Sequence, residues 1–138
     1  MGIEKAREEA RRWLQTAESD LESARILCTN GRYAHACFHA QQAGEKALKA
    51  IWHLCAGDPW GHSVQKLIGD LESVDIELFN DLKDLLPKGS KLDKYYIPTR
   101  YPNGLPDLVP DAAYFEDDAT TAIGISEELL DRVRSFIL

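Results

Sequence analysis

The most informative part of the chain runs from Arg32 to Leu54 and reads RYAHACFHAQQAGEKALKAIWHL. On a helical wheel, one broad side of this segment carries only small and apolar residues. The pattern therefore predicts an amphipathic helix, and its many small residues allow a neighbouring helix to approach closely. The residues on this side are Ala36, Cys37, Ala40, Ala43, Gly44, Ala47, Leu48, Ala50, Ile51 and Leu54.

The opposite side of the same predicted helix forms a polar stripe. Two interpretations of this stripe remain open: it is a solvated face, or it contributes to an anion site through the positive charge of Lys46 and Lys49. His35 and His39 are spaced to share a metal ion, but no carboxylate or cysteine lies beside them on the stripe, so no metal site is predicted. The stripe consists of His35, His39, Gln42, Lys46, Lys49 and His53.

Apolar spacings of three and four residues predict further helices on both sides of this segment. One runs from about residue 3 to residue 28, and Asn30-Gly31 ends it. A third helix is capped by Ser63, and a fourth spans about residues 76–86, where Pro87 ends it. The last helix starts near Asp111 and continues to the C-terminus.

Residues 87–110 have a different composition from the rest of the chain. They contain Pro87, Pro98, Pro102, Pro106 and Pro110, a density that predicts a long loop instead of a continuous helix. The predicted fold is all-α: an antiparallel up-and-down bundle of four to five helices with this Pro-rich loop before the last helix. A chain of 138 residues suits a single domain, 1–138.

The chain carries a formal net charge of −7, which argues against an extended nucleic-acid footprint, but charge is distributed unevenly. From Lys83 to Tyr101, five basic residues stand against two aspartates, and tyrosines are interleaved among them. Cations bind phosphates and aromatic rings stack on bases, so this pattern suits a nucleotide or RNA site. The basic residues are Lys83, Lys88, Lys91, Lys94 and Arg100.

We therefore formulate one candidate anion site, which requires the Pro-rich loop to fold back across the polar stripe. In the alternative, the tyrosines only pack the loop onto the bundle, and Arg100 pairs with Asp20 or Glu45. No phosphate-binding glycine motif is present. The candidate ligand-binding residues are Lys46, Lys49, Arg100, Tyr95, Tyr96, Tyr101, His39 and Gln42.

Three cysteines, Cys28, Cys37 and Cys55, lie within apolar helical patterns, which predicts reduced and unreactive thiols. This favours a cytoplasmic protein. No apolar run is long enough to predict a membrane span or a secretion signal. No catalytic residue, metal or cofactor is predicted.

The ordered set of motifs in this chain resembles the HEPN (higher eukaryotes and prokaryotes nucleotide-binding) domain family. Its strongest part is GRYAHACFHAQQAGEKALKA at residues 31–50, which is similar to the family's G-x-Y followed by F-H-A-Q-Q-A-x-E-K-A-L-K-A. Four further features match the family: Ala17, Asp20-Leu21 and Ala24 on the first helix, His62 and Leu67 after the second, Thr99-Arg100-Tyr101-Pro102, and the last helix.

The resemblance implies a helical bundle that forms dimers, binds nucleotides and works beside a minimal nucleotidyltransferase in toxin–antitoxin pairs. It also implies that ribonuclease members carry an arginine and a histidine with about four to six residues between them near a C-terminal helix. No histidine follows His62 here, and the pair Arg32 and His39 lies on the second helix instead. We therefore expect an accessory, non-catalytic protein. The alternatives are a ribonuclease with an atypical site and a homodimeric interaction module without ligand.

Overall fold

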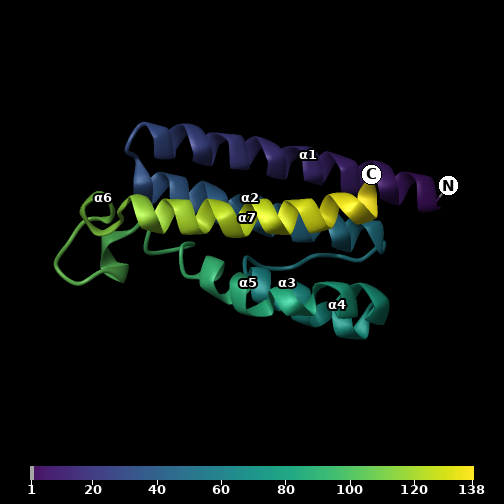
Figure 1. The fold of residues 1–138 in the computed structure, drawn as a ribbon. Helices are drawn as coiled ribbons and strands as arrows, with labels where there is room; N and C mark the ends of the chain where they lie inside the picture. Colours follow the sequence, from purple (N-terminus) through teal and green to yellow (C-terminus); the bar gives the residue numbers. More distant parts are fainter. Residues whose placement is uncertain (1) are drawn as a thin grey trace.

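The computed structural model describes residues 2–138, and every regular element within that range is a helix. Three long helices, α1 (Gly2–Thr29), α2 (Tyr33–Leu54) and α7 (Glu116–Ile137), lie side by side (Figure 1). Shorter helices form a second layer against α2: α3 (Val64–Gly69), α4 (Ile76–Leu82) and α5 (Leu86–Asp93). The predicted all-helical bundle is confirmed.

The direction of the long helices follows from which residues meet. Arg25 on α1 bonds to Glu127 on α7, and Arg7 reaches the carbonyl of Ile137, so α1 and α7 run antiparallel. Ser126 on α7 donates to the carbonyl of Ala40 on α2, and these two helices run in the same direction (Figure 1). The short helices α3–α5 provide the return path between α2 and α7.

Helix α2 is central because its small residues let neighbours come close. Every residue of its predicted apolar side is buried except Leu54, which is half-buried. Gly44 shows the closest approach, since a Cβ there would stand 2.5 Å from Leu92 Cδ2 of α5 and 3.1 Å from Leu129 Cδ1 of α7. Gly44 therefore sets the spacing of three helices.

The helix ends follow local chemistry. Gly31 ends the turn after α1 with a φ of 75°, a left-handed conformation in which glycine has no Cβ penalty. Ser63 caps α3 by accepting a hydrogen bond from the Lys66 amide, as predicted. Asp75 caps α4 in the same way, accepting from the Leu78 amide. The predicted fourth helix is divided into α4 and a 3-10 turn, η2 (Lys83–Leu85). Another 3-10 turn, η1 (Asp70–Ser73), follows α3 and precedes α4.

Two predicted boundaries were wrong. Pro87 does not end a helix; it lies in the first turn of α5, where a missing N–H costs nothing, so the loop starts after Asp93 and not at residue 87. The last helix is interrupted as well. A short α6 (Pro110–Ala113) precedes an extended pair, Tyr114 and Phe115, and α7 begins at Glu116. The remaining loop contains only a 3-10 turn, η3 (Pro102–Gly104).

The acidic run at the start of α7 suits its position in the helix. Glu116, Asp117 and Asp118 occupy the first turn, where negative charge complements the helix dipole. Asp118 also accepts a hydrogen bond from the Phe115 amide at 2.9 Å.

Candidate functional site

The two lysines of the polar stripe are bound to carboxylates of the same chain. Lys46 Nζ donates to Asp20 Oδ2 of α1 at 2.7 Å, and Lys49 Nζ donates to Glu45 Oε2 at 3.0 Å. The Lys49 side chain is only 13% exposed. Asp20 and Glu45 therefore neutralise the two charges that the sequence offered to an anion.

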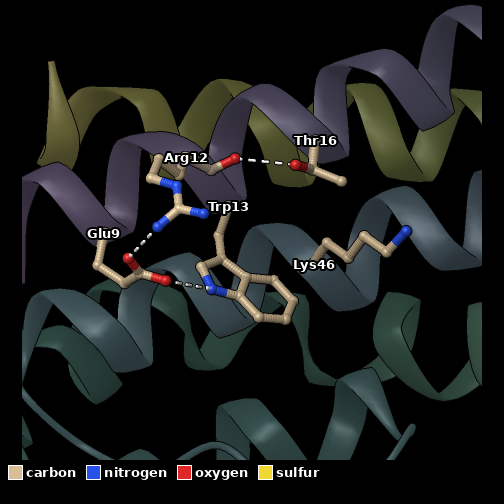
Figure 2. Close-up of a pocket in the computed structure, with 5 residues that line it drawn as sticks. All are labelled: Glu9, Arg12, Trp13, Thr16 and Lys46. Carbon is tan, nitrogen blue, oxygen red and sulfur yellow. Dashed lines mark hydrogen bonds and ion pairs between the residues drawn. The ribbon is translucent and has the colours of Figure 1, made fainter.

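Figure 2 shows the surroundings of Lys46 in a cavity of about 310 Å³ between α1 and α2. The Trp13 indole donates to Glu9, which also accepts from Arg12. The ammonium end of Lys46 points away from this group, toward its bond with Asp20. The cations of this cavity are thus occupied by acidic partners. Thr16 completes the lining.

Glu45 is the centre of a buried polar network, with a side chain only 4% exposed. Besides Lys49, its carboxylate accepts from the amides of Gln41 and Gln42, at 3.3 and 3.4 Å, and lies 3.3 Å from His62 Nδ1. Gln41 also donates to the backbone carbonyl of His62 at 3.0 Å. The glutamines of the FHAQQ motif therefore fix the chain between α2 and α3.

The stripe histidines face different neighbours. His39 Nδ1 is buried without a hydrogen-bond partner in the described part of the chain, and burial lowers the pKa of its ring. His35 Nε2 lies 4.0 Å from Asp111 Oδ1, and Arg32 lies 3.9 Å from the same carboxylate. Arg32 thus faces Asp111, whereas His39 Nδ1 has no partner among residues 2–138, so this pair with ribonuclease-like spacing shares no contact group.

Arg100 lies in a cluster of aromatic rings, which we call the Arg100 cluster: Arg100, Phe38, Tyr96 and Tyr101. Its guanidinium carbon is 4.4 Å from the ring centroid of Phe38, 4.5 Å from that of Tyr96 and 5.0 Å from that of Tyr101. Arg100 Nε donates to the Tyr96 carbonyl at 2.9 Å. Such stacking leaves the in-plane edge of a guanidinium open for further hydrogen bonds.

A cavity of about 240 Å³ adjoins the Arg100 cluster. Within residues 2–138, neither Asp20, Glu45 nor any other carboxylate lies within ion-pair distance of Arg100. Asp111 is the acidic group of the cavity, but its partners are Arg32 and His35. The cavity is lined by His35, Thr99, Arg100, Val109, Pro110 and Asp111.

Tyr95 points toward the core, unlike its neighbour Tyr96. Its ring meets that of Tyr114 edge-on at 6.1 Å, and burial raises the pKa of Tyr95 to about 12, with smaller contributions from nearby groups. Thr99, itself buried, donates its hydroxyl to the Tyr95 carbonyl and holds this turn of the loop together. Tyr95 thus supports the loop from inside.

The structure divides seven of the eight candidate residues into two groups, while Tyr95 packs apart from both, against the core and Tyr114. Arg100, Tyr96 and Tyr101 come together around Phe38, near the start of α2. Lys46, Lys49, His39 and Gln42 belong to α2 itself, and the two lysines lie between eight and eleven positions beyond Phe38, at least about 12 Å along a helix axis. Phe38 and His62, which were not among the predicted site residues, both flank Tyr96.

Phe38 and Trp52 are the two large aromatic side chains on the flanks of the polar stripe of α2. Trp52 meets α3, where its indole donates to the Leu67 carbonyl at 2.9 Å, and Phe38 meets the loop through Tyr96 and Arg100. Both side chains thus have partners within the chain.

Within residues 2–138, no helix has the length and apolarity needed to cross a membrane. The same residues contain no group of three His, Cys, Asp or Glu side chains arranged to hold a metal ion.

Comparisons with known proteins place the fold and its motifs in one family. The model of the HEPN domain family matches residues 10–136. A Methanocaldococcus jannaschii protein named as a candidate toxin, MJ1304, is 26% identical over 133 residues, which cover 93% of this chain and 88% of that protein.

Solved structures agree with this assignment. The Thermus thermophilus protein TT1696 is 39% identical with a TM-score of 0.83, and the match covers 92% of this chain and 97% of that one. An archaeal HEPN homologue, ST0689, is 34% identical with a TM-score of 0.77, covering 94% and 98%. A Thermotoga maritima HEPN domain protein is 28% identical with a TM-score of 0.71, covering 91% and 97%.

Proposed function

Because this chain belongs to the HEPN domain family, we propose that residues 1–138 form a single accessory HEPN domain that binds a nucleotide or RNA weakly. The binding site in this proposal is the Arg100 cluster with its adjoining cavity. The protein would act beside a minimal nucleotidyltransferase in a toxin–antitoxin-like system, without catalysis of its own.

The observation that carries the proposal is the state of Arg100. Its guanidinium is held in place by three aromatic rings and one bond to the Tyr96 carbonyl, yet it has no carboxylate partner among residues 2–138. A fixed guanidinium with an open edge can bind two phosphate oxygens at once. Tyr101 is 50% exposed beside it and offers a face on which a base can stack.

Lys46 and Lys49 have a different place in this proposal. Their ion pairs with Asp20 and Glu45 join α1, α2 and the His62 segment, so they support the site without touching the ligand. Gln42 belongs to the same supporting layer through its bond to Glu45, and the His39 ring lies edge-on to Phe38 with centroids 5.5 Å apart.

The proposal is tested by titrating the protein with mononucleotides and short single-stranded RNA at several salt concentrations. Affinity should fall as salt rises, because phosphate contacts release counterions. Arg100→Ala should weaken binding by about 1–3 kcal/mol, the scale of a lost hydrogen bond to a charged group. Arg100→Lys keeps the charge but lacks the planar fork, so it should restore only part of the affinity.

Arg11→Ala is the matched control. Arg11 is an exposed arginine in the first half of α1, and the N-terminal end of α1 lies at the end of the bundle opposite the loop (Figure 1). Its removal changes net charge by the same amount and should leave the affinity nearly unchanged. The proposal fails if no ligand binds at millimolar concentration, or if Arg100→Ala and Arg11→Ala have the same effect.

The partner part of the proposal is supported by the relative named as a candidate toxin and by family membership. It is tested by co-expressing this chain with a minimal nucleotidyltransferase encoded beside its gene. Co-purification of the two in a fixed ratio is expected. Their complete separation on a sizing column would contradict the pairing.

A further inference from the structure

His62 is held in one orientation by two separate bonds. Gln41 donates to its backbone carbonyl at 3.0 Å, and its ring nitrogen Nδ1 lies 3.3 Å from both oxygens of the buried Glu45 carboxylate. Gly61 precedes it with a φ of 82°, the left-handed turn that brings the chain back to α2. The histidine is therefore a fixed part of the surface, although its side chain is 56% exposed.

The bond to Glu45 determines which ring nitrogen of His62 carries the proton. The Glu45 carboxylate already accepts hydrogen bonds from the Lys49 ammonium and from the Gln41 and Gln42 amides, so it serves as an acceptor toward His62 as well. His62 Nδ1 must then be the donor. In the neutral ring the other nitrogen, Nε2, is left as a hydrogen-bond acceptor, and it has no partner within residues 2–138.

His62 and Arg100 share one neighbour. The His62 ring stacks on Tyr96 with centroids 4.5 Å apart and planes inclined by 17°. The guanidinium carbon of Arg100 also lies 4.5 Å from the Tyr96 centroid. The centroid of the His62 ring and the guanidinium carbon of Arg100 are therefore separated by no more than twice 4.5 Å. The sugar is the part of a nucleotide that lies next to its phosphate. A nucleotide whose phosphate binds Arg100 can therefore extend its ribose toward His62.

We infer that His62 reads the sugar of the bound ligand: its Nε2 accepts a hydrogen bond from the ribose 2′-hydroxyl of a nucleotide whose phosphate binds Arg100. The site would then prefer RNA and ribonucleotides to their deoxy counterparts, because the 2′-hydroxyl is the group that distinguishes them. This inference rests on the proposed function and adds the sugar specificity of the same site.

The test compares short oligouridine with oligodeoxyuridine of equal length, which have the same base and differ in the 2′-hydroxyl. A third strand with 2′-O-methyl groups keeps the sugar oxygen but cannot donate. Wild-type protein should bind the ribose strand about fivefold more tightly than either of the others, the scale of one net hydrogen bond.

His62→Phe is the decisive variant, because phenylalanine keeps a ring for the stack on Tyr96 and removes the acceptor. It should bind all three strands alike, with the affinity that wild-type protein has for the deoxy strand. His53→Phe is the control: His53 also stacks on an aromatic ring, that of Trp13 at 5.2 Å, but lines a different cavity. It should keep the ribose preference. Circular dichroism and thermal melting check that both variants are folded.

The outcomes separate the two proposals. Equal affinity of the wild-type protein for ribose and deoxy strands, or a preference that survives in His62→Phe, overturns the role of His62. The proposed function still stands in that case if Arg100→Ala weakens both strands. Absence of binding to every strand overturns both proposals.

Discussion

The carboxylate of Asp93, the last residue of α5, binds Ser63 at the start of α3, and the two residues are 30 positions apart in the sequence. One oxygen accepts from the Ser63 hydroxyl at 2.6 Å, and the other accepts from the Val64 amide at the same distance. The Gln65 amide adds a third bond at 3.2 Å. Asp93 thus satisfies amides that a helix start leaves unpaired, and it joins α5 to α3 within the layer of short helices.

Asp93→Ala should lower the free energy of unfolding by about 2 kcal/mol, because it removes a charged cap with several bonds at once. Urea denaturation measures this value. Asp131→Ala is the control, since Asp131 is 76% exposed and, among the residues that the structure describes, pairs with Arg134 alone. Its removal should change stability by less than about 1 kcal/mol. An equal decrease in the free energy of unfolding in the two variants would show that the Asp93 cap contributes no more to stability than an exposed ion pair.

Gly44→Ala should destabilise the protein by about 1–3 kcal/mol, because the new methyl group would collide with Leu92 and press on Leu129. Gly124→Ala offers the opposite case in the same fold. Gly124 lies on α7, and a methyl group added there would meet no neighbouring atom within 4 Å, so alanine should raise stability by up to about 1 kcal/mol. Thermal melting of both variants would decide between a packing effect and a general effect of helical glycine.

The protein should lose stability as the pH rises above about 9. Burial, the largest cause, raises the pKa of the Cys37 thiol from 9.0 to about 12. The unfolded chain then releases the proton near pH 9 while the folded chain keeps it, so stability declines from there toward pH 12. Tyr95, with its pKa raised from 10.0 to about 12, adds to the decline.

Cys37→Ala isolates the thiol. The variant should be less stable near neutral pH, because it loses buried volume, but its stability should fall less steeply above pH 9. Parallel urea titrations below and above that pH give the two slopes. Identical slopes would mean that Cys37 does not contribute to the alkaline loss.

We expect a homodimer, with a sedimentation mass near twice 15.5 kDa at micromolar concentration. Exposed apolar side chains gather near the start of α6 and α7: Leu108, Val109 and Phe115 are 52%, 58% and 63% exposed. Covering them removes apolar surface from water. Phe115→Ser should shift the equilibrium toward monomer. Ile3→Ser, an exposed control on α1, should not, and a wild-type monomer at all concentrations would contradict the dimer.

Local patterns predicted the elements of the fold but not every boundary. The cap at Ser63 was predictable because it depends on residues three positions apart. Pro87 was misread because a proline fits equally well after one helix and in the first turn of the next. The break at Tyr114 had no local signal; the extended backbone there accompanies a tertiary contact with Tyr95.

The candidate site was predicted in part for a related reason. Composition identified the cationic and aromatic residues, and the Arg100 cluster contains three of them. The pairing of each lysine with its carboxylate depends on the packing of α1 against α2. The sequence suggested Asp20 as a partner for a cation but did not indicate that this cation is Lys46. His62 was identified from the family resemblance, but its orientation depends on the bond to the buried Glu45. The helical wheel placed Glu45 on α2 without showing that it bonds to His62.

The alanines on the buried side of α2 should tolerate substitution by a smaller residue better than substitution by a larger one. Ala36, Ala40, Ala43, Ala47 and Ala50 are all fully buried, so truncating any of them removes at most one methyl group. Enlarging any of them forces a neighbouring backbone to move, since packed interiors have no spare volume. In a saturation mutagenesis scan of α2, side-chain size should therefore separate functional from non-functional variants at each of these positions. Such a map would identify the helix contacts without a structure.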